Sequence, residues 1–307
     1  MEKPIKKTKT KVKQPLGDRI FDYSNATIMV FFLIIIIVPM LYLISCAFSE
    51  SVVTQDIILL PRVAKRGGGS RIGITLEHFK FIINDANGGM FLTSVKNTLI
   101  ITVVVTLGSN ILMALAAYPL SKVNCPYRKT ILMFFLIVML FSAGIIPSFI
   151  LMRTVHLTEN ILGIILISIT NVFNLLLFKT TFEGIPKELE ESAHLDGASS
   201  LQLFFKIIIP ITIPTFASCC FFTLVGCING YSSALLFIQT NNEAKPMALF
   251  LYELIATFES SNPGIDVSAK INIQSAGILL SIIPILAIYP FIIRYIKTGV
   301  TLGSVKG

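Results

Sequence analysis

The sequence predicts an all-α, polytopic membrane protein with six transmembrane helices. Of its 307 residues, 54% are hydrophobic and only 14% are charged, whereas ordinary soluble domains carry about 25% charged residues. The charges are absent from six long blocks, and a soluble surface cannot be built from such blocks. Lys and Arg are also concentrated in alternate connecting segments, which is typical of a chain that crosses a membrane several times.

Each charge-free block approaches the roughly 20 apolar residues that a helix needs to cross the hydrocarbon layer. Pro39, Pro147, Pro214 and Pro284 lie inside blocks and are tolerated, because neighbouring helices and waters satisfy the freed carbonyls. After the fifth block an external segment is expected from about Gly230, since the charge-free stretch is too long for one span and too short for two. The predicted spans are 26–48, 97–120, 130–152, 160–178, 207–228 and 271–293.

The positive charges predict that both ends of the chain are cytoplasmic. Both terminal segments and the loops after spans two and four hold about twice as many Lys and Arg as the opposite loops, and cytoplasmic loops carry this excess. The first span is interpreted as an uncleaved anchor, because its apolar run is too long for a signal peptide and no small-residue cleavage site follows. The predicted organisation is a basic tail 1–25, the first span 26–48, an external loop 49–95, a transmembrane core 96–297 containing a cytoplasmic loop 183–206, and a tail 298–307.

Several kinds of chemistry are not supported by the sequence. The Gly-rich segment 67–73 lacks the Lys-Ser/Thr end of a phosphate-binding loop, and the cysteines show no metal-ligand spacing. We therefore expect no cofactor or metal on this chain. The net charge of +8 does not indicate nucleic acid, because the basic residues lie between apolar blocks. No span contains Asp, Glu, Lys, Arg or His, although ion-coupled carriers usually place such a residue there, so any energy source is expected on the cytoplasmic side.

The loop after span four is the most informative segment, and it predicts a short helix. Pro186 suits the first helical position, the following glutamates complement the helix dipole, and Gly197 is a natural left-handed stop. Leu189 and Ala193 form a small apolar patch at helical spacing. A helix of this length is not stable alone. It is therefore either a capped connection between two spans or a docking element for another surface.

The same loop resembles the Glu-Ala-Ala loop of permease subunits of bacterial ATP-binding-cassette importers. In that family the triplet is followed by three residues, a Gly, nine residues and Ile-x-Leu-Pro. This chain has Glu191-Ser192-Ala193, Gly197 and Ile207-Ile208-Ile209-Pro210 at the same spacing, with Ser192 and Ile209 as the departures. Asn97-Thr98-Leu99 and the segments 117–121 and 144–148 are similar to the carbohydrate branch, closest to its permeases for lipoprotein and polysaccharide-fragment uptake.

The resemblance implies the type I importer permease fold and a multi-pass location in the bacterial cytoplasmic membrane. It implies that the loop is a coupling helix that docks on a separate ATPase, with Leu189, Glu191, Ser192, Ala193, Asp196 and Gly197 at the contact. ATP and Mg would be bound by the ATPase subunits. The implied partners are a second permease subunit in a heterodimer, two ATPase subunits, an extracellular lipid-anchored solute-binding protein and membrane lipid.

The residues expected along the substrate pathway are less well marked. The carbohydrate branch usually has Trp-Asn where this chain has Ile228-Asn229, and the chain has no Trp. The candidates are Asn171, Asn174, Phe222, Asn229 and Tyr231, with helix packing and interhelical hydrogen bonds as their alternative uses. A permease for peptides or amino acids, an ion-coupled carrier and a membrane scaffold remain as alternative functions.

Overall fold

The computed structural model describes residues 16–50, 59–65, 69–85, 89–141, 143–261 and 267–303. Over these ranges the chain is mainly helical, as the sequence predicts, with a single two-stranded sheet. The lysines of the predicted basic tail lie outside the described residues, as does the segment 51–58 of the predicted external loop.

Four of the predicted spans correspond to helices that are long and apolar enough to cross a membrane. The second half of the fourth, from Val172, is capped by Asn171, whose side chain accepts a hydrogen bond from a backbone N–H of the first turn. Within the ranges searched, the four are Ile20–Ala47 in α1 (Leu16–Ala47), α3 (Phe91–Ser121), Ile161–Glu183 made of α6 (Ile161–Ser168) and α7 (Val172–Glu183), and Ala269–Phe291 in α14 (Val267–Gly303).

The third and fifth predicted spans are each a bent pair of helices, so the expectation of one helix over each block is wrong. In the third, α4 (Arg128–Leu140) and α5 (Ile145–Thr154) meet at 106°. In the fifth, the segment Ser200–Ile211 meets α11 (Ile213–Asn229) at 80°. This second bend lies between Pro210 and Pro214, and proline interrupts helical hydrogen bonding. Counting each pair as one span gives up to six.

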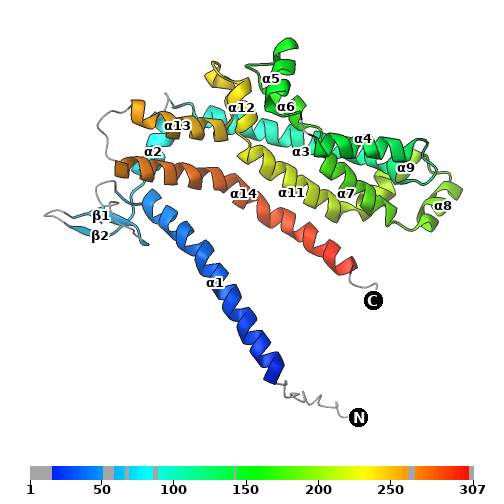
Figure 1. Cartoon of the computed structure of the whole chain (residues 1–307), viewed down its shortest axis with the longest axis horizontal. Helices are drawn as coiled ribbons and strands as arrows, with labels where there is room; N and C mark the ends of the chain where they lie inside the picture. Colours follow the sequence, from blue (N-terminus) through cyan, green and yellow to red (C-terminus); the bar gives the residue numbers. More distant parts are fainter. Residues whose placement is uncertain are drawn as a thin grey trace, which may run out of the picture.

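The helices α3, α7, α11 and α14 lie side by side, whereas α1 leans away from them (Figure 1). The α1 side chains are exposed along most of the helix and become buried only from Ser45 to Ala47, near the start of α14. In a membrane this exposed apolar face contacts lipid or another subunit and not water.

The two ends of the molecule differ in structure (Figure 1). One end carries the antiparallel hairpin, in which Arg62 pairs with Ile72, and the predicted external segment after Gly230, which is helical. The elements of the hairpin segment and of the segment after Gly230 are β1 (Arg62–Ala64), β2 (Ser70–Ile72), α2 (Glu77–Lys80), η2 (Phe81–Asp85), α12 (Ser232–Phe237), η5 (Asn242–Ala244) and α13 (Met247–Ser261). The opposite end carries α8 (Lys187–Leu195) and α9 (Ser200–Leu203).

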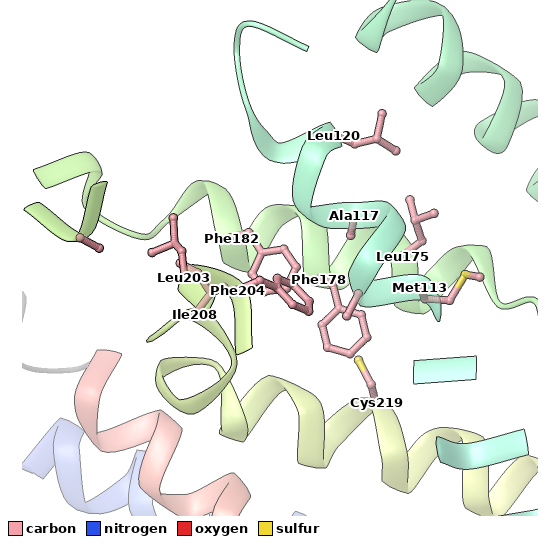
Figure 2. Packing of buried hydrophobic residues seen from close by; sticks show 12 residues of the cluster. Met113, Ala117, Leu120, Leu175, Phe178, Phe182, Leu203, Phe204, Ile208 and Cys219 are labelled. Atoms are coloured by element: carbon pink, nitrogen blue, oxygen red, sulfur yellow. The ribbon is translucent and has the colours of Figure 1, made fainter. Parts of the chain in front are cut away.

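A buried apolar cluster connects α8 to the long helices (Figure 2). Phe178 and Phe182 from α7 meet Phe204 from η4 (Phe204–Ile208), and the Phe182 and Phe204 rings are 6.1 Å apart. Tyr118 of α3 lies against the same pair, 5.3 Å from the Phe204 ring. The short element η4, which precedes α10 (Ile209–Ile211), is therefore fixed by aromatic packing.

Candidate functional site

The predicted loop helix exists as α8, a helix of nine residues that starts at Lys187. Pro186 precedes the helix instead of occupying its first position, because its ψ of 133° is extended. Glu188 and Glu190 lie in the first turn, where negative charge complements the helix dipole. The predicted start is therefore wrong by one residue.

The predicted stop at Gly197 is confirmed. Gly197 has φ +79°, and its N–H donates to the His194 carbonyl at 3.0 Å, while the Ala198 N–H donates to the Ala193 carbonyl at 3.0 Å. These two bonds form a Schellman motif, which satisfies the last carbonyls of a helix and needs a left-handed residue at this position.

The helix has one buried contact and a broad exposed face. Ala193 is 5% exposed and belongs to the cluster that includes Leu203 and Phe204. Sequence reasoning missed Leu195, which is 89% exposed on the described surface. The other predicted coupling residues are all exposed: Leu189, Glu191, Ser192, Asp196 and Gly197.

An ion pair joins α8 to the end of α3. The Lys122 ammonium contacts the Glu190 carboxylate and lies 4.4 Å from the centre of the Tyr118 ring. A cavity of about 320 Å³ lies beside this ion pair, between the end of α3 and α8. It is lined by both members of the pair and by Glu191 and His194. Neither Lys122 nor Glu190 was predicted as a site residue, since only the packing of α3 and α7 brings positions so distant in sequence together.

A second ionic cluster fixes the end of α7. The Glu183 carboxylate accepts from Arg128 and pairs with Lys179 at 2.8 Å. Arg128 also donates from Nε to the Leu120 carbonyl at 2.8 Å. The α3–α4 turn and the C-terminal end of α7 are thereby connected immediately before α8.

The polar candidates of the fourth span are in different environments. The Asn174 side chain is fully buried, and its Nδ2 donates to Asn110 Oδ1 at 3.0 Å and to Thr223 Oγ1 at 2.9 Å. Asn171 Oδ1 accepts from the Asn174 N–H at 3.2 Å. Asn174 therefore joins α3, α7 and α11, which is the interhelical use of such a side chain.

The remaining pathway candidates line two separate cavities. Asn171 and Phe222 line one of about 240 Å³ between α3, α6 and α11. Asn229 and Tyr231 line another of about 260 Å³ between α11, α13 and α14, where Tyr252, which sequence reasoning missed, stacks on Tyr231. The five candidates thus do not converge on one site.

Metal binding finds no support in the part of the chain that the structure describes. There, no group of three or more His, Cys, Asp or Glu side chains is placed to hold a metal ion. The Cys219, Cys220 and Cys227 thiols are free.

Comparison with known proteins gives matches over most of the chain. The family described as "Binding-protein-dependent transport system inner membrane component" matches residues 110–302. The polygalacturonan/rhamnogalacturonan transport system permease protein YtcP of Bacillus subtilis (strain 168) is 31% identical over 95% of this chain and 100% of that protein. Protein LplC of the same organism is 31% identical over 94% of this chain and 96% of its own length.

A solved structure is also similar to this chain. It is the crystal structure of a bacterial ABC transporter involved in the import of the acidic polysaccharide alginate, one chain of which matches with a TM-score of 0.76 and 28% identity. The match covers 92% of this chain and 99% of that chain.

Proposed function

This chain belongs to the family of inner membrane components of binding-protein-dependent transport systems, and we propose that it forms half of the translocation pathway of an ATP-driven carbohydrate importer. The family is one of ABC transporter permeases, so the chain is a non-catalytic membrane subunit. The full-length similarity to a permease named for polygalacturonan and rhamnogalacturonan supports an oligosaccharide or polysaccharide fragment as the substrate.

The single observation that carries the coupling part of this proposal is the shape of α8. Ala193 packs the helix onto the buried cluster, and Gly197 ends it. Leu189, Glu191 and Leu195 remain exposed at one end of the molecule. An apolar and acidic face held on a rigid base suits docking in a groove of another protein. ATP and Mg are bound by two ATPase subunits, and their closure moves α8 and the helices packed on it.

The proposed topology has six spans and both termini in the cytoplasm. It is supported by the excess of Lys and Arg in the terminal segments and in the two loops near α8. The separation in Figure 1 of the hairpin from α8 also agrees with one external and one cytoplasmic end. The chain would therefore be a multi-pass protein of the bacterial cytoplasmic membrane.

The remaining partners follow from the same proposal. A second permease completes the pathway, and an extracellular lipid-anchored binding protein delivers the substrate. The largely exposed apolar surface of α1 is available for lipid or for the second permease. Asn171, Phe222, Asn229 and Tyr231 contribute to the pathway through the two cavities, while Asn174 holds the helices beside it.

The test is uptake by the whole complex reconstituted in vesicles. We expect Glu191→Lys to abolish both co-purification of the ATPase and ATP-driven sugar uptake, because it reverses a charge on the docking face. The matched control is Glu77→Lys, an exposed glutamate in α2 at the opposite end, which should leave both unchanged.

Two results would contradict the proposal. Uptake that continues without the ATPase and stops when an ion gradient is collapsed would identify an ion-coupled carrier. ATP-driven uptake of peptides or amino acids, with none of any sugar, would reject the carbohydrate assignment alone.

A further inference from the structure

The cavity between α11, α13 and α14 has the composition of a binding site for a sugar ring. It has a volume of about 260 Å³ and lies at the end of the molecule remote from α8. We propose that Tyr252, Tyr231, Asn229 and Ser281 form a subsite that stacks one pyranose ring of the transported saccharide. The proposal rests on the carbohydrate function proposed above and adds the residues and the mode of contact.

The aromatic side of this cavity is already organised. Tyr231 and Tyr252 are stacked with ring centroids 4.7 Å apart and 20° between their planes. Each of the two residues nevertheless remains 40% exposed. A sugar ring presents a flat face of C–H groups, which packs on a rigid aromatic plane, and a tyrosine pair loses little side-chain entropy when it binds.

Polar side chains around the stacked tyrosines are placed to bind the hydroxyl groups of a sugar. Asn229 is exposed, and its amide both donates and accepts hydrogen bonds. The two phenol groups and the Ser281 hydroxyl complete the polar set of the cavity. Ser281 donates its proton to the Ile278 carbonyl at 2.7 Å, so its oxygen is left to accept a hydrogen bond from a sugar hydroxyl. Few polar groups in a mainly apolar lining are typical of small-molecule sites. The described apolar lining residues are Ile228, Ala248, Leu251, Ile255 and Ile278.

The charge and size of the cavity narrow the ligand class. Among the described lining residues there is no Asp, Glu, Lys, Arg or His, so the subsite contacts the ring faces and hydroxyls and not a carboxylate. Its volume is below the roughly 300–1,000 Å³ of drug-sized ligand sites, which suits one ring of a chain.

A glycine brings two walls of the cavity close together. Gly277 of α14 lines the cavity, and a Cβ there would meet Leu251 Cδ2 of α13 at 3.2 Å. The absence of a side chain at Gly277 therefore allows α14 to approach α13 closely beside the stacked tyrosines.

The test measures uptake KM in the reconstituted complex, with trisaccharides of galacturonate, of arabinose and of α-1,4-linked glucose as probes. We expect Tyr252→Leu to raise KM about fivefold for the transported probe, because leucine is apolar but not planar. Tyr252→Phe and Tyr252→Trp keep the plane and should stay within about twofold of the unaltered KM. Co-purification of the ATPase shows that each variant assembles, and Tyr127→Leu, at an exposed tyrosine outside the cavity, is the matched control.

The outcomes separate the subsite from the proposed function. If Tyr252→Leu behaves as Tyr252→Phe does, the cavity needs only apolar filling by lipid or the second permease, and the stacking subsite is rejected while carbohydrate import stands. If the unaltered complex takes up peptides or amino acids with ATP and no sugar, the proposed function and the subsite are both rejected.

Discussion

Replacing Gly197 tests whether the left-handed stop of α8 is essential for coupling. At φ +79° a residue with a Cβ is strained, at a cost of about 1–2 kcal/mol. A Cβ built there meets no atom within 4 Å, so packing inside the chain contributes nothing to that cost. We expect Gly197→Ala to shift the equilibrium between the Schellman stop and a frayed helix end about 5- to 30-fold toward the frayed end, relative to the unaltered chain.

Gly197→Asn separates backbone strain from obstruction of docking. Asparagine is larger than alanine but adopts the left-handed conformation more readily. Backbone strain therefore predicts that the asparagine variant is more active than the alanine variant, whereas obstruction predicts the reverse. Gly17→Ala is the matched control, since Gly17 also has open space around a Cβ and lies in α1 without a positive φ.

The assay is sugar-stimulated ATPase activity of the reconstituted complex, with co-purification of the ATPase as a measure of docking. The expected order of stimulation is glycine, then asparagine, then alanine, with the Gly17→Ala complex equal to the unaltered one. An alanine variant as active as the glycine form would refute the reasoning, because the stop would then be unnecessary for docking.

Three further predictions concern contacts that only the structure reveals. Lys122→Glu and Glu190→Lys should each destabilise the complex by about 1 kcal/mol, as expected for a partly exposed ion pair, and the double exchange should recover most of the loss. Thermal denaturation of all four forms gives the coupling energy between the two residues. Strictly additive effects of the two single changes would exclude the ion pair. Asn174→Leu should cost about 1 kcal/mol, since two intramembrane hydrogen bonds of about 0.6 kcal/mol each are lost; an unchanged Tm would contradict the network. For Glu159, burial tends to raise the carboxyl pKa, but hydrogen bonds from the backbone N–H groups of residues 239–241 outweigh it and lower the pKa below the usual 4.5. The contribution of the Glu159 carboxylate to folding stability is thus present above about pH 4.5 and is lost as the pH falls through its lowered pKa. The Tm difference between Glu159→Gln and the unaltered chain should therefore shrink on acidification. A Tm difference that does not change with pH would contradict this prediction.

The membrane class and the loop helix were predictable because they depend on local sequence. Long charge-free blocks place the spans, and Gly197 marks a helix end because few other residues adopt its φ. The bends in the third and fifth spans were not predictable in the same way. The apolar pattern continues across Pro210 and Pro214, so hydropathy gives no sign of where the helix changes direction.

In the candidate site, too, local features were predictable from the sequence and contacts between distant residues were not. Motif spacing placed Glu191 and Ala193 on one helix that stops at Gly197, and α8 holds the first two and ends just before the third. It could not show that Ala193 is the buried contact, nor that Glu190 pairs with Lys122.

The sequence by itself determined the membrane class, the family resemblance and the helix in the loop after span four, since each depends on hydropathy or on residues close together in the chain. Only the tertiary structure decided which polar side chains meet. Asn174 is buried against Asn110 and Thr223, and Tyr252 stacks on Tyr231. These partners are separated by tens of residues, and no local pattern encodes the packing of α3, α7, α11 and α13 that brings them together.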